Sequence, residues 1–236
     1  KCTDGLAQSN VKFTVFDKVV PNCPDRLIMM GYNLYKHSKC DGIIAVGGGS
    51  SMDCAKVIGA KKDQHRLPAL DYTVVEGDVI KVGSNTGNVF DVSGHTIGHI
   101  AVYFEQSKLL FTADSLMALG CGRLFEGTPI HMWENLSKLK DLDPNTTVCS
   151  GHEYTEANGR FAITIEPNNS ALQNRIRDIT EKRSRNISTV PSTLREELET
   201  NPFLRPDSPE IRHTLGMKTN TDAEVFAEIR RRKDNF

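Results

Sequence analysis

The chain has 236 residues, of which 38% are hydrophobic and 25% charged, and its formal net charge is −1. This composition suits a globular protein with enough apolar side chains to form a core. A near-neutral chain gives no sign of a nucleic-acid or membrane-surface partner. No apolar run reaches the roughly 20 residues that span a bilayer, and no signal segment is expected, because the first residues lack a charged stretch followed by an apolar one.

The six cysteines are scattered along the chain and form no C-x-x-C pair. A chain of this length does not depend on disulfides, so we expect reduced thiols and a cytoplasmic location. The composition leaves the oligomeric state open.

The first part of the chain alternates between strand-like and helix-like patterns. β-branched and apolar runs indicate strands, and apolar residues at helical spacing indicate helices. We expect, in order, a strand at residues 11–20, a helix around 27–34, a strand at 42–46, a Gly-Gly-Gly-Ser turn at 47–50, and a helix at about 51–58.

The middle of the chain predicts an antiparallel meander, because short β-rich runs follow one another with turn signals between them. These runs are Tyr72–Val75, Val79–Val82, Asn88–Val92, Ile100–Phe104 and Leu109–Thr112. A helix at about 131–142 and a further strand at 146–150 should follow.

From Glu166 onward the pattern is helical, with several start signals. Thr193 with Glu196, and Thr221 with Glu224, fit capping boxes. Ser208 followed by Pro209 fits an N-cap with proline in the first turn.

Three predicted strands are followed directly by a histidine or an aspartate: His95, Asp114 and His152. Strand ends can aim side chains at a shared point, and imidazole with carboxylate suits Zn, Fe or Mn. Taken singly, each signal is weak, because a lone histidine at a strand end is more often structural and a lone aspartate is more often a cap.

Taken together, eight ordered segments resemble hydroxyacylglutathione hydrolase (glyoxalase II) of the metallo-β-lactamase superfamily, from about residue 57 or 61 to the C-terminus. The segments are G-H-T-x-G-H (94–99), F-T-x-D-S-L (111–116), C-G-R-L-F-E-G-T (121–128), G-H-E-Y-T (151–155), E-P-N-N (166–169), V-P-S-T-L (190–194), N-P-F-L-R (201–205) and R-R-K-D-N-F (231–236).

This resemblance implies an α/β protein with a metallo-β-lactamase-like αββα sandwich, an incomplete or spliced N-terminal half, and a helical C-terminal segment. It implies hydrolysis of S-2-hydroxyacylglutathione thioesters such as S-D-lactoylglutathione, by hydroxide held between two metal ions about 3.5–4 Å apart. By resemblance His95 binds one metal, His152 the other, and Asp114, the catalytic carboxylate, bridges them. His99 is implied to be a supporting residue.

The resemblance also implies that Arg123, Tyr154, Arg230 and Lys233 hold the glutathione part of the substrate. The guanidinium fork suits a carboxylate partner. Phe125 stands where many members of the family carry tyrosine, which removes one hydrogen bond to substrate. The alternative for residues 230–233 is a solvated helix end whose cations face the helix dipole.

The family's T-H-x-H-x-D-H motif is absent, since the sequence contains neither H-x-H nor D-H. Glycines follow the strand at 42–46, where the motif would stand. The full two-metal centre therefore cannot be filled from matched positions, and the resemblance implies an enzyme that lacks ligands on which its activity depends. His95, Asp114 and His152 could still hold one metal.

The front of the chain resembles a different family. C-D-G-I-I-A-V-G-G-G-S-S-M-D-C-A-K (40–56) is similar to the segment of iron-dependent alcohol dehydrogenases that binds the NAD(P) pyrophosphate. Gly47, Gly48, Gly49 and Ser50 would then bind NAD(P) through backbone amides at a helix start. A lone glycine turn is more often a tight connection, so we do not expect NAD(P) binding.

The chain therefore has the pattern of a splice: a dehydrogenase-like segment (1–58), a metallo-β-lactamase-like core (59–165) and a helical substrate-binding segment (166–236). Three functions stay open: a thioesterase acting on a small glutathione thioester, a non-catalytic chimeric scaffold that still binds glutathione, and a nucleotide-binding oxidoreductase fragment.

Overall fold

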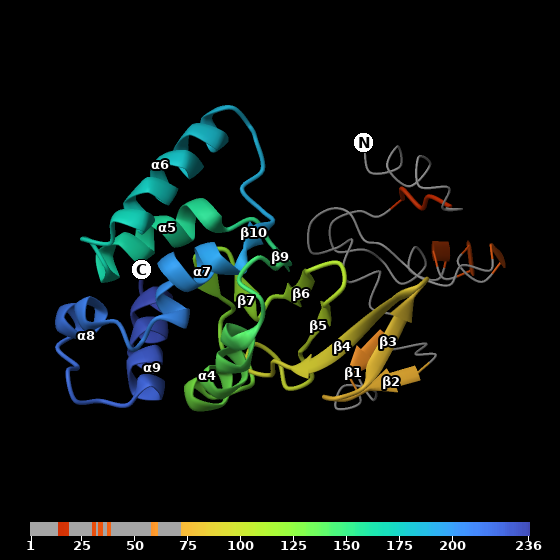
Figure 1. The fold of residues 1–236 in the computed structure, drawn as a ribbon, viewed down its shortest axis with the longest axis horizontal. Helices are drawn as coiled ribbons and strands as arrows, with labels where there is room; N and C mark the ends of the chain where they lie inside the picture. The colour runs from red at the N-terminus through yellow and green to blue at the C-terminus, as the bar shows by residue number, and fades with distance from the viewer. Residues whose placement is uncertain (1–13, 19–29, 32, 35–36, 39–57, 61–71) are drawn as a thin grey trace.

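A computed structural model describes residues 14–18, 30–31, 33–34, 37–38, 58–60 and 72–236 (Figure 1). The predicted strand at 42–46, the glycine turn at 47–50 and residues 51–57 of the second predicted helix lie outside the described residues. Met30, Gly31, Asn33, Leu34 and His37 are helical, as the spacing predicts.

A six-stranded sheet forms the centre of the described structure, in the order β10-β9-β6-β5-β4-β3. Strands β3 to β6 are the expected antiparallel meander. The strands are β3 (Val79–Val82), β4 (Asn85–Asp91), β5 (Ile100–Phe104), β6 (Leu109–Ala113), β9 (Thr147–Ser150) and β10 (Ser192–Thr193).

The direction of the strands decides which ends lie together. β4 and β6 are both antiparallel to β5, so they run the same way. β9 is parallel to β6. The carboxyl ends of β4, β6 and β9 therefore meet at one edge of the sheet.

Two small sheets accompany the central one. β1 (Ile58–Ala60) pairs in parallel with β2 (Tyr72–Val74), and β7 (Leu116–Met117) forms a hairpin with β8 (Gly120–Cys121). Ile58 thus lies in a strand, whereas the sequence predicted the end of a helix there. Residues 14–18 have no regular structure although they belong to a predicted strand, because β-propensity needs a pairing partner to take effect.

The helices follow the predicted start signals. Thr193 and Thr221 each close a capping box with the glutamate three residues later. Ser208 is the N-cap before Pro209, but its hydroxyl bonds Glu166 and not the helix. The helices are α4 (Pro129–Ser137), η2 (Lys138–Asp141), α5 (Thr155–Ile165), α6 (Ser170–Ser184), α7 (Leu194–Thr200), η3 (Pro202–Leu204), α8 (Pro209–Leu215) and α9 (Asp222–Asp234).

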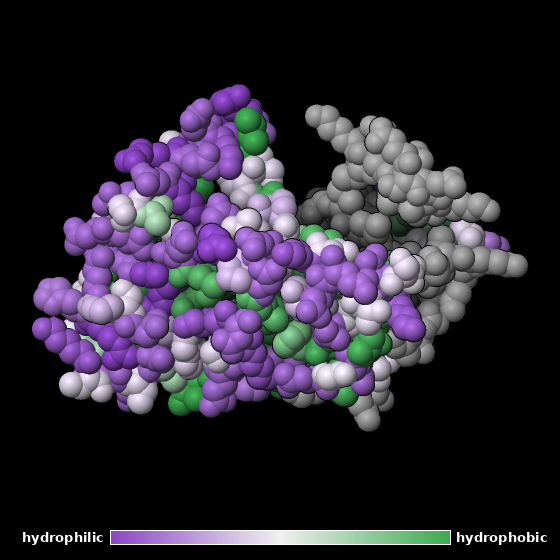
Figure 2. Space-filling model, in the orientation of Figure 1, coloured by the Kyte–Doolittle hydropathy of each residue, from purple (hydrophilic) through white to green (hydrophobic). Residues whose placement is uncertain are grey.

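The helices gather around one end of the sheet, whereas β3 and β4 extend away from them (Figure 1). Phe161, Phe203 and Phe226 are buried between the helices; Phe161 stacks on Phe203, and Phe203 meets Phe226 edge to face. This shared core joins the C-terminal helices to the strands. The face seen in Figure 2 is mostly hydrophilic over the helices. Among the described residues, no helix has the length and apolarity to cross a bilayer. The structure is of the expected α/β class.

Candidate metal centre

The three predicted ligand side chains converge at one edge of the sheet. His95, Asp114 and His152 each follow one of the strands that run in the same direction. His95 Nε2 lies 3.8 Å from Asp114 Oδ2, and His152 Nδ1 lies 2.7 Å from Asp114 Oδ1. Their side chains are 16%, 19% and 28% exposed, so the cluster is sheltered but open to a small molecule.

The orientation of His95 is set by the main chain. Its Nδ1 lies 2.7 Å from the backbone carbonyl oxygen of Arg123. A carbonyl can only accept, so Nδ1 carries a proton, and in the neutral tautomer that this leaves, the Nε2 lone pair lies on the side of Asp114. Gly122 makes this approach possible, since a Cβ there would lie 2.9 Å from His95 Nδ1 and 2.1 Å from the Asp114 carbonyl oxygen.

Asp114 is presented by an irregularity at the end of β6. The pairing of β6 with β9 shifts register between Phe111 and Ala113. Ala113 adopts φ 45°, in the left-handed region that disfavours a side chain. The Ala113 carbonyl accepts from Gly151 N at 2.7 Å, which fixes the bulge to the end of β9. Such bulges re-aim the next side chain.

His99 supports the site from behind. The backbone N–H of Asp114 donates to His99 Nε2 at 3.0 Å. This bond occupies the lone pair that a metal would need, so His99 is placed as the supporting residue that the resemblance implies.

Aromatic rings flank both imidazoles. Tyr154 stacks on His152 with ring centroids 4.9 Å apart and an interplanar angle of 3°. Phe125 contacts His95, with ring centroids 4.8 Å apart. Tyr154 is 52% exposed and Phe125 68%, so both rings also face outward, where a substrate could meet them.

The predicted substrate-binding cations differ in exposure. The Arg123 side chain is 67% exposed, with Nε 3.9 Å from Asp234 Oδ1. Arg230 is buried and donates to the Cys121 carbonyl at 2.9 Å and to Asp234 at 2.7 Å. The buried Nε of Arg230 has no partner. The structure thus brings Arg230 beside the Cys121–Arg123 segment, although inside the protein.

Lys233 lies between two phenylalanine rings, with Nζ 5.2 Å from the Phe161 centroid and 5.3 Å from that of Phe236. Nζ also donates to the Ala157 carbonyl at 3.2 Å. Burial, together with the charges of Arg230 and other nearby arginines, lowers the pKa of Lys233 to about 8. An anionic ligand beside Nζ would raise this pKa again, because it favours the charged ammonium.

The surroundings of Cys121 do not suit a nucleophile. Its side chain is buried, and burial raises the pKa of the thiol to about 11 against the opposing effect of Arg230. A neutral thiol is a poor nucleophile, so the C-G turn serves the structure.

Two of the three side chains, those of His95 and Asp114, lie at a separation that two ligands of one metal ion could have. Metal–ligand bonds of about 2.0–2.2 Å allow two ligands of one ion to lie up to about 4 Å apart, and His95 Nε2 and Asp114 Oδ2 meet this condition. His152 instead bonds directly to the other carboxylate oxygen. In this arrangement, no group of three or more His, Cys, Asp or Glu side chains among the described residues could hold a metal ion.

The predicted NAD(P)-binding residues Gly47, Gly48, Gly49 and Ser50 lie outside the described part of the chain, so the structure neither brings them to this centre nor separates them from it.

Family models match the two ends of the chain. The model described as "Hydroxyacylglutathione hydrolase C-terminus" matches residues 153–236. The model described as "Iron-containing alcohol dehydrogenase" matches residues 1–87. Both resemblances found in the motifs are confirmed.

Solved structures give weaker likenesses. The B3 metallo-beta-lactamase BLEG-1 is 17% identical, with a TM-score of 0.47 over 75% of this chain and 84% of that chain. ETHE1 from Myxococcus xanthus is also 17% identical, with a TM-score of 0.47 over 87% of this chain and 83% of that chain. At these TM-scores neither likeness supports an argument.

Curated relatives cover most of the chain. The proteins named hydroxyacylglutathione hydrolase from Cereibacter sphaeroides and Methylococcus capsulatus are 52% and 49% identical, over 86% and 88% of this chain and 80% and 81% of their own lengths. The protein of the same name from Ruegeria pomeroyi is 57% identical over 76% of this chain and 71% of its own. The chain therefore belongs to the hydroxyacylglutathione hydrolase family.

Proposed function

We propose that this chain hydrolyses S-2-hydroxyacylglutathione thioesters, releasing a hydroxy acid and glutathione. Family membership supports the reaction type, and the convergence of His95, Asp114 and His152 at one sheet edge is the observation that carries the proposal. These thioesters are small molecules, and the partly exposed cluster is accessible to them.

The metal would be Zn, Fe or Mn, held by His95 and Asp114, with His152 as the further ligand. When bound, such an ion lowers the pKa of water and polarises a carbonyl. The protein's own contribution is orientation. Arg123 O holds His95 in one tautomer, and the bulge at Ala113 directs the Asp114 carboxylate toward both imidazoles.

The glutathione part would lie beside Arg123, Tyr154 and Lys233. Glutathione carries two carboxylates, which suit an exposed guanidinium and an ammonium group. The Lys233 ammonium, whose pKa is lowered to about 8, gains most from an anionic partner. Arg230 would act from beneath, through the Cys121 carbonyl to which it donates.

Elemental analysis and a thioester assay on the same sample test this function. The purified chain should contain Zn, Fe or Mn and hydrolyse S-D-lactoylglutathione, and Asp114→Ala should lose both. Asp207→Ala is the matched control, because Asp207 is an exposed carboxylate outside the cluster, 4.0 Å from Lys140 Nζ. Metal-free protein, or hydrolysis that survives Asp114→Ala, would count against the proposal.

The match of residues 1–87 to iron-containing alcohol dehydrogenases favours a second candidate, a chimeric chain. Its segments would be 1–58, 59–165 and 166–236. A non-catalytic scaffold would bind glutathione without turnover, and Arg230→Ala would weaken that binding. Binding of NAD(P) at residues 47–50 would change NADH fluorescence on titration, and an unchanged signal excludes it.

Two described cysteines, Cys121 and Cys149, are free thiols. This supports the proposal of a reducing, cytoplasmic location.

A further inference from the structure

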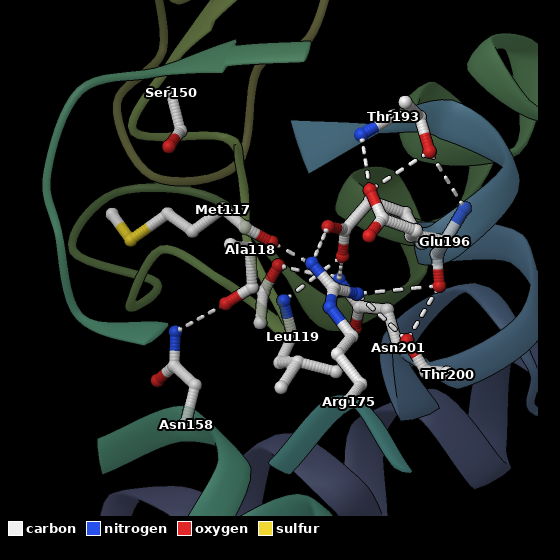
Figure 3. A network of polar contacts seen from close by, with 12 residues as sticks. Met117, Ala118, Leu119, Ser150, Asn158, Arg175, Thr193, Glu196, Thr200 and Asn201 are labelled. Carbon is white, nitrogen blue, oxygen red and sulfur yellow. Dashed lines mark hydrogen bonds and ion pairs between the residues drawn. The ribbon is translucent and has the colours of Figure 1, made fainter. Parts of the chain in front are cut away.

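A buried polar cluster connects the C-terminal helices to the turn at residues 117–120 (Figure 3). We call Glu197, Asn201 and Asn158 the α7 polar cluster, after the helix that carries or adjoins the first two. Their exposed fractions are 0%, 0% and 6%. Buried polar groups are costly unless they are hydrogen-bonded, so the partners of this cluster indicate what it is for.

The partners are main-chain groups of one turn, Met117–Gly120. Glu197 Oε2 accepts from Leu119 N at 2.9 Å. Asn201 Nδ2 donates to the Met117 and Gly120 carbonyls at 3.1 and 3.0 Å. Asn158 Nδ2 donates to the Ala118 carbonyl at 3.0 Å. Every residue of the turn is therefore held by a side chain from outside the hairpin.

This turn needs such support. Leu119 has φ 57°, a left-handed conformation that is unfavourable for leucine. The charge of Glu197 is compensated by Arg175 of α6, whose Nη2 donates to Oε1 at 2.5 Å. Asn201 Nδ2 also lies 3.0 Å from Glu197 Oε2, so its two N–H protons are shared among three acceptors and the cluster is a single network.

The turn occupies the middle of the segment that builds the metal centre. Asp114 lies at one end of this segment, and the Arg123 carbonyl that orients His95 lies at the other. Gly122 packs closely against the Asp114 carbonyl and the His95 ring, and its N–H donates to the Ser115 carbonyl at 3.3 Å. A shift of the turn would therefore be passed to Gly122 and Arg123, and from there to the His95 ring.

A second buried carboxylate, that of Glu166, belongs to a separate hydrogen-bond network and serves as a comparison. Glu166 accepts from Arg205 at 2.7 and 3.0 Å and from Ser208 at 2.6 Å. Glu166 is 2% exposed. Among the described residues, the side chains that bond its carboxylate lie within residues 169–208, outside the segment from Asp114 to Arg123.

We propose that Glu197 and Asn201, assisted by Asn158, are positioning residues for the His95–Asp114 pair. They hold the turn at 117–120, and the turn fixes the Arg123 carbonyl that selects the tautomer and direction of His95. The inference deepens the proposed function, on which it rests for the use of the pair. The C-terminal helices thereby set the geometry of the ligands as well as contributing substrate-binding residues.

The test uses the full chain, freed of metal by a chelator, and the ¹⁵N and ¹H signals of its imidazoles. In the unaltered chain, the Nδ1-bound proton of His95 should exchange slowly, because it is bonded to Arg123 O. Glu197→Gln, and the milder Asn158→Ala that removes one hydrogen bond, should make this proton exchange at least tenfold faster. Glu166→Gln is the matched control. It should leave the exchange rate of the His95 proton unchanged, even if its Tm falls as much as that of Glu197→Gln.

Zinc affinity gives a second measurement. Loss of an outer hydrogen-bonding partner typically weakens a metal site about 10–100-fold, so Glu197→Gln should fall in that range relative to Glu166→Gln. If both folded variants, Glu197→Gln and Asn158→Ala, keep the original exchange rate, or if Glu166→Gln accelerates it equally, the proposal is wrong. If Glu197→Gln does not fold, Asn158→Ala decides. If the variants show faster exchange but the unaltered chain has no thioesterase activity, the proposed function is wrong and the positioning role stands.

Discussion

The close approach of Gly122 to the metal centre leads to a sharp prediction for Gly122→Ala. The added Cβ would lie 2.1 Å from the Asp114 carbonyl oxygen and 2.9 Å from His95 Nδ1. The main chain would have to retreat by about 1 Å, and overpacking of this kind costs about 1–3 kcal/mol. In a chain of this size that lowers Tm by about 2–4 °C for each kcal/mol. The displaced His95 ring should also lose metal affinity.

Gly159→Ala is the matched control for the same chemical change. A Cβ at Gly159 would meet only Ile176 and Leu119 at 3.4 Å, an ordinary contact. Gly159 lies inside α5, where alanine is favoured over glycine by about 0.5–1 kcal/mol. Thermal unfolding of both variants should therefore give shifts of opposite sign. The reasoning is refuted if Gly122→Ala is as stable and binds zinc as tightly as the unaltered chain.

Three further predictions concern charge and packing. Burial raises the pKa of Glu166, but hydrogen bonds from Arg205 and its neighbours outweigh this and lower it. The stabilisation is present above the usual glutamate pKa and is lost as pH falls toward the folded value. In urea unfolding, Glu166→Gln should be about 3–5 kcal/mol less stable than the unaltered chain at pH 7. Its free energy of unfolding should also depend less on pH in the acid range. The lowered pKa of Lys233, about 8, predicts that glutathione affinity measured by calorimetry falls above that pH, and Lys233→Met should abolish this pH dependence. Phe203→Ala removes a fully buried ring and should cost about 3–5 kcal/mol in the same unfolding assay, whereas a loss below 1 kcal/mol would contradict the packing described.

Local signals in the sequence predicted much of the fold. Val79–Val82 and Ile100–Phe104 are strands with the expected bounds. The capping boxes at Thr193 and Thr221 form because their residues are neighbours in the chain and need no tertiary contact. β4 begins at Asn85, earlier than expected, because pairing with β3 extends it through residues of low strand propensity.

The convergence of His95, Asp114 and His152 could be predicted from their placement after strands and from the family motifs. The supporting network could not. Nothing local marks Glu197 as buried, since a glutamate in a helix is normally solvated. Asn201 is the first residue of the N-P-F-L-R motif, but the sequence does not indicate its partners, because its hydrogen bonds reach residues more than 80 positions away. Such pairings appear only once the chain is folded.

The parallel pairing of β6 with β9 has a consequence for how the protein assembles. Asp114 and His152 are 38 positions apart in the chain, and the connection between their strands, which includes α4, has to close before the strands can pair. Contacts between distant parts of a chain form slowly, because a long loop has to close first. In a refolding experiment, zinc binding should therefore occur later than formation of the β3–β6 meander, at the time when β9 pairs with β6.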